Sequence, residues 1–418
     1  MTAQSDDVRE RIRALEGTGM RTFWEPEPVV WARTEGCVVW DAEGRAYLDL
    51  YAGFAVANVG YCHPRVTQAI RKQAGVMTHC PSAAPSEVRA ELYARLGAIA
   101  PPELDRVLLA ITGAMANETA VQLARAATGR RNVITFSGAY PGRSVGALRY
   151  AGKRAYREQY GIAAEADFIP FPDPYRSPWA GDRDPGSAAL GLLEHALTDP
   201  ASGVEPPACV LVEPIQGNGG VVVPPDGFLR GLRELCDRTG TVLVFDEIQC
   251  GFGRSGRMWA CEHEGVVPDL MTVGKGIGGG LALAALLGRS ELMTTWEPDA
   301  VTSTFLANAL NAAAGCAAID VLRDEGLVER SARLGARALT RLQNELTRVA
   351  DVRGRGLFLG LELADPDLAA EKQRALRDRG VLVGRGGRSG NVLILAPPLV
   401  IEEDVLDGGL AAIVEALG

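Results

Sequence analysis

Residues 241–287 constrain the fold more than any other part of the chain. They read TVLVFDEIQCGFGRSGRMWACEHEGVVPDLMTVGKGIGGGLALAALL. A short β-branched and aromatic run ends at Asp246, a glycine-broken loop follows, and a second apolar run leads into Lys275 between two glycines. A carboxylate at the end of a buried strand is costly unless it meets a cation. The glycines leave room for a flat ligand beside the lysine, so Asp246 and Lys275 are predicted to serve one site.

Strands alternate with helices over residues 106–287. This order predicts a mainly parallel sheet that is covered by helices on both faces. Ligands of such sheets lie at the carboxyl ends of the strands. The polar residues that follow the apolar runs are therefore predicted to meet at one edge. The runs expected to form these strands are residues 106–111, 132–136, 209–212, 242–245 and 270–273.

The ordered pattern DEIQCGFGRSG, PDL and GKGIGGG resembles the class III (subgroup II) aminotransferases, which are pyridoxal-phosphate enzymes of fold type I. The resemblance runs from about residue 28 to residue 400. It implies an α/β fold with a seven-stranded, mainly parallel sheet in a large domain, and a smaller α+β domain built from both termini. The expected parts are an N-terminal segment of the small domain (1–60), the large cofactor-binding domain (61–315) and the C-terminal small domain (316–418).

The resemblance implies pyridoxal 5′-phosphate as the cofactor and gives roles to the central residues. Lys275 would form the Schiff base with the cofactor and move the proton during the reaction. Asp246 would keep the ring nitrogen protonated, and Gln249 would lie near the phenolic oxygen. The other cofactor residues that the resemblance implies are Tyr140 on the ring, Glu213 as a buried acid, Thr112, Gly113 and Ala114 at the phosphate, and Thr304 reaching the phosphate of a partner subunit.

The small-residue turn at 112–118 can form an anion site, although taken alone an ordinary strand–turn–helix is the favoured interpretation. It opens a helix directly after a strand, so its backbone N–H groups point at whatever lies there. Thr112 can still cap this helix, whereas Met115 replaces the glutamate that would complete a capping box. Phosphate binding is expected to survive because it depends on backbone donors.

Two positions predict the kind of substrate. Many relatives carry a glutamate in a QGxGG loop and an arginine shortly before a Pro-Pro pair, and that arginine binds the α-carboxylate of amino-acid substrates. Here these positions are Asn218 and Ile394. Losing only the arginine would leave a buried, unpaired carboxylate. Losing both charged residues leaves a neutral surface made by Asn218 and Ile394, called the neutral wall below. The principal substrate is therefore predicted to lack an α-carboxylate.

Other substrate contacts are expected from Arg143 and from residues 160–187. Arg143 stands where glutamate-using relatives place an arginine for the distal carboxylate of glutamate, although an outward-facing surface arginine is an equal alternative. Residues 160–187 are rich in proline, glycine and aromatics and are the expected substrate-facing loop.

These features predict an aminotransferase that acts on a primary amine or its aldehyde, with glutamate or 2-oxoglutarate as co-substrate. The substrate expected first is an amino sugar, as in the C-6′ aminotransferases of aminoglycoside biosynthesis of the neomycin and gentamicin type. A pyridoxal-phosphate epimerase acting at the same carbon and a diamine or ω-amine aminotransferase are the alternatives, and a non-enzymatic regulator is a third class. The resemblance also implies a homodimer with shared sites.

Composition excludes several other classes. The net charge of −9 argues against nonspecific nucleic-acid binding. Four histidines without an H-x-x-x-H pair, and eight cysteines without a C-x-x-C pair, predict no metal site. The polar N-terminus and the lack of a long apolar run predict neither a signal peptide nor a membrane span, and free thiols suit the cytoplasm.

Overall fold

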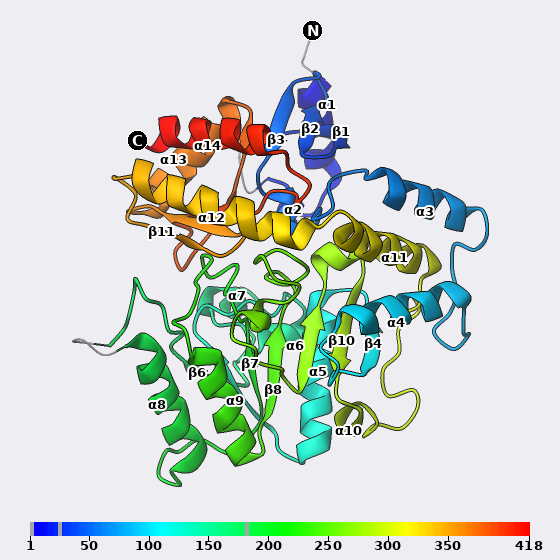
Figure 1. Ribbon diagram of the computed structural model, residues 1–418, viewed down its shortest axis with the longest axis vertical. Helices are drawn as coiled ribbons and strands as arrows, with labels where there is room; N and C mark the ends of the chain where they lie inside the picture. Colours follow the sequence, from blue (N-terminus) through cyan, green and yellow to red (C-terminus); the bar gives the residue numbers. More distant parts are fainter. Residues whose placement is uncertain (1–3, 24–26, 180–183) are drawn as a thin grey trace.

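The computed structural model describes residues 4–23, 27–179 and 184–418 of the chain. Figure 1 shows the blue N-terminal segment and the orange-to-red C-terminal segment side by side above the central sheet. Residues 1–3 and 24–26 of the predicted N-terminal segment, and residues 180–183 of the predicted substrate-facing loop, lie outside the described residues.

The central sheet confirms the predicted mainly parallel architecture and contains one antiparallel strand. Strand β10 runs antiparallel to both of its neighbours, and the remaining pairs are parallel. The carboxyl ends of the other six strands consequently lie at one edge. In spatial order the seven strands are β4 (Arg106–Ala110), β10 (Ala284–Gly288), β9 (Leu270–Val273), β8 (Val242–Asp246), β7 (Pro207–Val212), β5 (Asn132–Phe136) and β6 (Asp167–Ile169).

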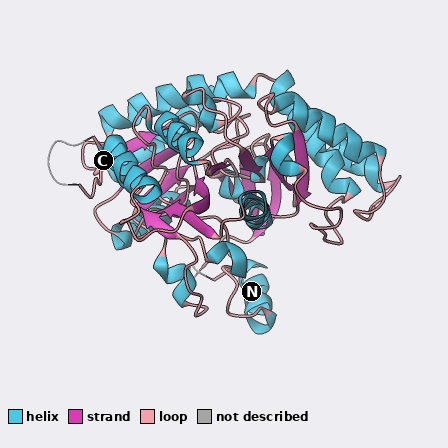
Figure 2. Ribbon diagram, turned by 90° about the horizontal axis from the view of Figure 1, so that it is seen from below, coloured by secondary structure: helices cyan, strands magenta, loops and turns pink. Residues whose placement is uncertain are grey.

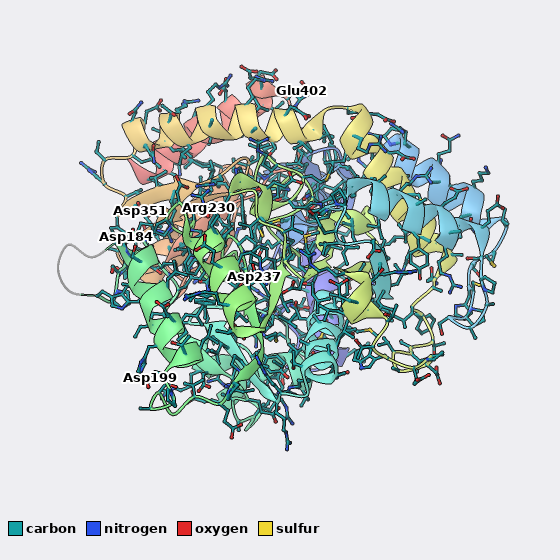
Figure 3. The ribbon with its side chains drawn as sticks, turned by 60° about the horizontal axis from the view of Figure 1, so that its bottom comes forward. Asp184, Asp199, Arg230, Asp237, Asp351 and Glu402 are labelled. Carbon is teal, nitrogen blue, oxygen red and sulfur yellow. The ribbon has the colours of Figure 1, made fainter. Side chains whose placement is uncertain are left out.

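Both faces of this sheet are covered, which explains why its strands are apolar at nearly every position. Successive residues of a strand point to opposite faces. Val133 packs with residues of α5 (Gly113–Thr128), whereas Ile134 belongs to the cluster that contains apolar residues of α9 (Phe228–Thr239). Figure 2 shows the strands between layers of helices. Figure 3 shows Arg230 and Asp237 on the outer side of α9, where both are exposed.

Two smaller sheets join the ends of the chain. Strand β13 pairs parallel with β3, so a C-terminal strand completes an N-terminal sheet. This agrees with the smaller α+β part that was predicted from both termini, and the division at residues 60 and 315 stays a prediction. The first sheet contains β1 (Trp31–Glu35), β2 (Val38–Asp41), β3 (Ala46–Asp49) and β13 (Val381–Leu382), and the second contains β11 (Asp351–Gly354), β12 (Leu359–Glu362), β15 (Val392–Leu395) and β14 (Gly384–Gly386).

The remaining helices connect and cover these sheets. Within the described residues, no helix is both long enough and apolar enough to cross a membrane. Long α12 lies between the C-terminal helices and the central sheet in Figure 1. The remaining helices of the chain are α1 (Gln4–Leu15), α2 (Ala52–Ala55), α3 (Pro64–Ala74), α4 (Glu87–Ile99), α6 (Val145–Leu148), α7 (Arg154–Glu158), α8 (Pro185–Thr198), α10 (Ser290–Met293), α11 (Ala309–Asp324), α12 (Leu327–Glu345), α13 (Pro366–Asp378), α14 (Glu403–Leu417) and the 3₁₀ turns η1 (Ala260–His263) and η2 (Lys275–Gly278).

Candidate active site

Asp246 ends strand β8 and lies in a fixed, buried position at the carboxyl edge of the sheet. Its carboxylate accepts hydrogen bonds from the Asn117 side chain (2.7 Å) and from the backbone N–H of Ile248 (3.0 Å). Thr272 on β9 donates to Asn117 Oδ1 at 2.8 Å, which fixes the orientation of the Asn117 amide. Burial raises the pKa of Asp246. In the described part of the chain no cationic side chain makes an ion pair with it, so its charge is left for a ligand.

Lys275 follows β9 on a strained backbone. Its φ of 46° lies in the left-handed region, which is unfavourable for a residue with a side chain and is frequent at functional sites. A Cβ on Gly276 would lie 2.6 Å from Asn58 Nδ2, so the next residue must be glycine. Burial lowers the pKa of the lysine amine, and Asp246 and Glu213 act against this shift. A lowered pKa favours the neutral amine, which is the form that attacks a carbonyl carbon.

The N-terminus of α5 forms an anion-binding corner beside this pair. Thr112 caps the helix through a hydrogen bond from the N–H of Met115 (3.2 Å). The N–H groups of Gly113 and Ala114 have no acceptor within the helix, as in any first turn. A Cβ on Gly113 would lie 2.6 Å from Ile248 Cδ1. Only a small, backbone-lined surface fits here, and this suits a phosphate group.

Tyr140, Glu213 and Gln249 surround the same edge of the sheet. Glu213 accepts hydrogen bonds from the N–H of Tyr140 (3.0 Å) and from the N–H of Gly217 (2.9 Å). Burial raises the pKa of Glu213. Gln249 packs against Gly217, where a Cβ would lie 2.1 Å from its Oε1, and its side chain hydrogen-bonds with Tyr51. The structure thus brings the predicted cofactor residues of this chain together, with the exception of Thr304.

Thr304 lies apart from this group. It is exposed in the loop before α11, next to Phe305, whose ring centroid is 5.7 Å from that of His79. Across the described residues it makes no hydrogen bond with any other predicted site residue. Its predicted partner is in a second subunit, so its role stays a prediction.

The predicted substrate residues lie next to one another. Ile394 is 1% exposed on β15, and a Cβ on Gly386 would lie 2.7 Å from its Cδ1 and 3.0 Å from the carbonyl oxygen of Asn218. The guanidinium of Arg143 lies 3.7 Å from the centroid of the Tyr156 ring. Arg143 therefore faces the aromatic residues of the site, although its side chain is exposed in the chain as described.

The segment 160–187 is only partly a loop, because β6 pairs with β5 inside it. Tyr175 and Pro178 line a cavity of about 620 Å³ together with Arg388 and Asn391, and none of the predicted site residues lines that cavity. The expected contact between this segment and the substrate stays a prediction.

The sequence interpretation missed several residues of the site. Asn117 lies one helical turn after Gly113 on α5, and this spacing from the phosphate turn is a signal that could have identified it. Short α7 is polar and has no hydrophobic pattern, so nothing in the sequence indicated its role. The missed residues are Asn117, Thr272, Tyr51, Lys153 and Tyr156.

The arrangement defines a lysine-dependent cofactor enzyme and fits pyridoxal 5′-phosphate. A buried carboxylate without a cation suits a protonated ring nitrogen, the backbone corner of α5 suits a phosphate, and Lys275 supplies the amine. The chain belongs to the class III aminotransferase family, which matches residues 23–417. It is a pyridoxal-phosphate-dependent aminotransferase, as predicted.

Relatives of known activity cover nearly the whole chain. The acetylornithine aminotransferase of Methanopyrus kandleri is 40% identical over 98% of this chain and 99% of its own length. The diaminobutyrate–2-oxoglutarate aminotransferase of Rhizobium meliloti is 35% identical (99% and 92%), and the leucine/methionine racemase of Thermococcus litoralis is 33% identical (99% and 96%). The solved ornithine aminotransferase of Toxoplasma gondii has a TM-score of 0.87 and 31% identity, covering 100% of this chain and 95% of that one.

Proposed function

We propose that this enzyme transfers an amino group to or from a primary carbon that bears no carboxylate, in a diamine or ω-amine, with glutamate or 2-oxoglutarate as co-substrate. The observation that carries the proposal is the buried Ile394 beside Asn218. A carboxylate held against the Ile394 side chain would lose its hydration without meeting a cation on β15. An uncharged CH₂–NH₂ carbon has no such penalty.

The side chains around Lys275 have complementary tasks in this proposal. Bound pyridoxal phosphate supplies an electrophilic aldehyde and an electron-accepting ring. Lys275 would hold the cofactor through its amine and, when free, would carry a proton to and from the reacting carbon. Asp246, oriented by Asn117, would keep the proton on the ring nitrogen. The N–H groups of Gly113 and Ala114 would hold the phosphate, and Tyr140 would hold the ring.

The first expectation, an amino-sugar substrate, has no support among the relatives. Their names refer to acetylornithine, diaminobutyrate and ornithine, which are compounds with two nitrogen atoms on an aliphatic chain. The diamine and ω-amine alternative is therefore better supported. An amino sugar offers the same kind of primary amine carbon and is kept in the test below.

Epimerisation is the second candidate reaction. A relative named as a leucine/methionine racemase is 33% identical over 99% of this chain. Such a reaction needs the same lysine but no amino acceptor, because the proton returns to the carbon from which it was removed. The two reactions differ in whether the bound cofactor is converted to its pyridoxamine form.

A panel of donors should distinguish these functions. The panel contains 1,4-diaminobutane, 4-aminobutyrate, ornithine, an aminoglycoside with a 6′-amine and leucine. Each is assayed with 2-oxoglutarate for glutamate formation and, in D₂O, for exchange of the hydrogen on the amine carbon. We expect the terminal amines to be the best donors because the carbon that reacts carries no carboxylate. Preference for leucine would contradict the neutral wall, and exchange with inversion but no glutamate would favour the epimerase.

We also propose a homodimer in which Thr304 reaches the cofactor phosphate of the partner subunit. The proposal is supported by exposed apolar residues next to this loop, namely Phe305 (57% exposed) and Val76 (74% exposed). Asn308 donates to the carbonyl oxygen of Thr78 at 3.3 Å, so the two segments lie side by side. A patch of this kind on one chain is typical of an interface.

Light scattering at assay concentration should give twice the chain mass of 44.3 kDa. Activity should fall together with the dimer fraction on dilution, because each site would need a residue of the other subunit. An active species of single-chain mass would contradict the shared site.

A further inference from the structure

Lys153 is a half-buried cation whose hydrogen-bond acceptors are all neutral oxygens. It precedes α7, and its ammonium donates to the Asn218 carbonyl oxygen (3.5 Å), to Asn218 Oδ1 (3.2 Å) and to the Gly387 carbonyl oxygen (2.5 Å). It makes no ion pair with any carboxylate in residues 4–23, 27–179 and 184–418. A partly buried charge of this kind is costly unless an anion compensates it.

A second cation lies against the same aromatic ring. The Arg143 guanidinium lies 3.7 Å from the Tyr156 ring centroid, and Lys153 Nζ lies 5.5 Å from it. Arg143, too, has no carboxylate partner among the described side chains. Glu213 attracts the Lys153 ammonium but makes no ion pair with it, and its hydrogen bonds come from two backbone N–H groups. Two cations that have no ion-pair partner among the described residues, beside one ring, form a receptor for an anion.

Asn218 keeps the charge of Lys153 available. The amide oxygen accepts from Lys153 at 3.2 Å and from the Tyr156 hydroxyl at 2.9 Å. A glutamate at the same position would place a carboxylate at this distance and pair with the ammonium internally. The neutral amide holds the lysine in place while leaving its charge for a ligand.

We propose that Lys153 supplies the second cation for the dicarboxylate co-substrate, beside Arg143, whose role at the distal carboxylate the resemblance already implies. This inference deepens the proposed function and rests on it in naming the co-substrate. Ile394 offers no cation to the second carboxylate, whereas the ammonium of Lys153 contacts Asn218, the residue beside Ile394. The amine substrate uses the neutral wall, and the dicarboxylate uses the two cations. One pocket thereby accepts two chemically unlike substrates.

Glutarate binding to the cofactor-loaded enzyme tests the proposal directly. Glutarate has two carboxylates but no keto group, so it binds without reacting, and valerate is the matched single-carboxylate control. Calorimetry at pH 7 should show tighter binding of glutarate than of valerate. Lys153→Met and Asn218→Glu should each weaken glutarate binding by about 10- to 100-fold, the usual size of one charge-assisted hydrogen bond. The affinity for valerate, which has a single carboxylate, should fall much less in these two variants.

The pH dependence gives a second readout that a purely structural role would not change. Burial and Arg143 lower the pKa of Lys153 to about 8, against the opposing influence of Glu213, and burial keeps the Tyr156 hydroxyl neutral by raising its pKa. The ammonium is charged below about pH 8, so glutarate affinity should fall as the pH rises past that value. Lys153→Arg should remove this fall, because arginine stays charged.

Two outcomes would overturn the proposal. One is glutarate binding by Lys153→Met that matches the original enzyme, and the other is an identical pH profile in Lys153→Arg. Equal losses of glutarate affinity, amine conversion and thermal stability in Lys153→Met would assign the lysine a structural role instead. Failure of the amine reaction with intact, Lys153-dependent glutarate binding would count against the proposed function and not against this receptor.

Discussion

Replacing Lys275 by alanine should abolish turnover and remove the visible absorption band of the bound cofactor. The reason is that this amine would both attach the cofactor and move the proton. We expect a loss of at least about a thousandfold, since proton transfer by a positioned side chain alone contributes about 10²- to 10⁴-fold. The measurement combines the steady-state rate with the absorption spectrum of the purified enzyme.

Lys72→Ala is the matched control for this variant, because Lys72 is exposed on α3. It should keep both the band and the rate. Normal turnover by Lys275→Ala would show that another residue carries the chemistry.

Asp246→Asn should lower kcat by about 10²- to 10³-fold, similar to the loss of one preorganised electrostatic contact at a reacting group. The substitution keeps the shape but removes the negative charge that would hold the ring nitrogen protonated. An asparagine amide would also turn a donor toward Asn117 or Ile248, which costs about 1–3 kcal/mol. Thermal unfolding and cofactor content must therefore be measured beside the rate.

Glu213→Gln separates a local charge effect from general disturbance of the site. Glu213 is also a buried carboxylate, but it accepts only backbone N–H groups. Its variant should lose less activity than Asp246→Asn. If Asp246→Asn keeps more than about a tenth of the original rate with full cofactor content, the assigned role of Asp246 is wrong.

Short-range patterns were sufficient to predict most of the central sheet. Strands β5 and β9 have the predicted bounds, because apolar runs and polar flanks mark their ends. Strand β10 was not among the expected strands, and its direction could not be read from the sequence, since a buried strand is an apolar run whichever way it points.

Some residues of the site could be predicted from the sequence, and others could be found only from the structure. Lys275, Asp246 and Thr112 follow strands in motifs that can be read along the chain, and the structure brings them to one edge. The contact of Lys153 with Asn218 joins residues 65 positions apart in sequence. Asn218 lies in the QGxGG loop pattern, whereas Lys153 is in no recognisable pattern, and the contact between them is created only by tertiary packing.

The conversion of the cofactor by a single terminal diamine is the most direct test of the central claim. The purified enzyme is mixed with 1,4-diaminobutane without any acceptor, and the absorption spectrum is recorded until it is stable. We predict that the visible band disappears as the pyridoxamine form accumulates, and that 2-oxoglutarate then restores it. A band that is unchanged by the diamine but is lost with leucine would contradict the account.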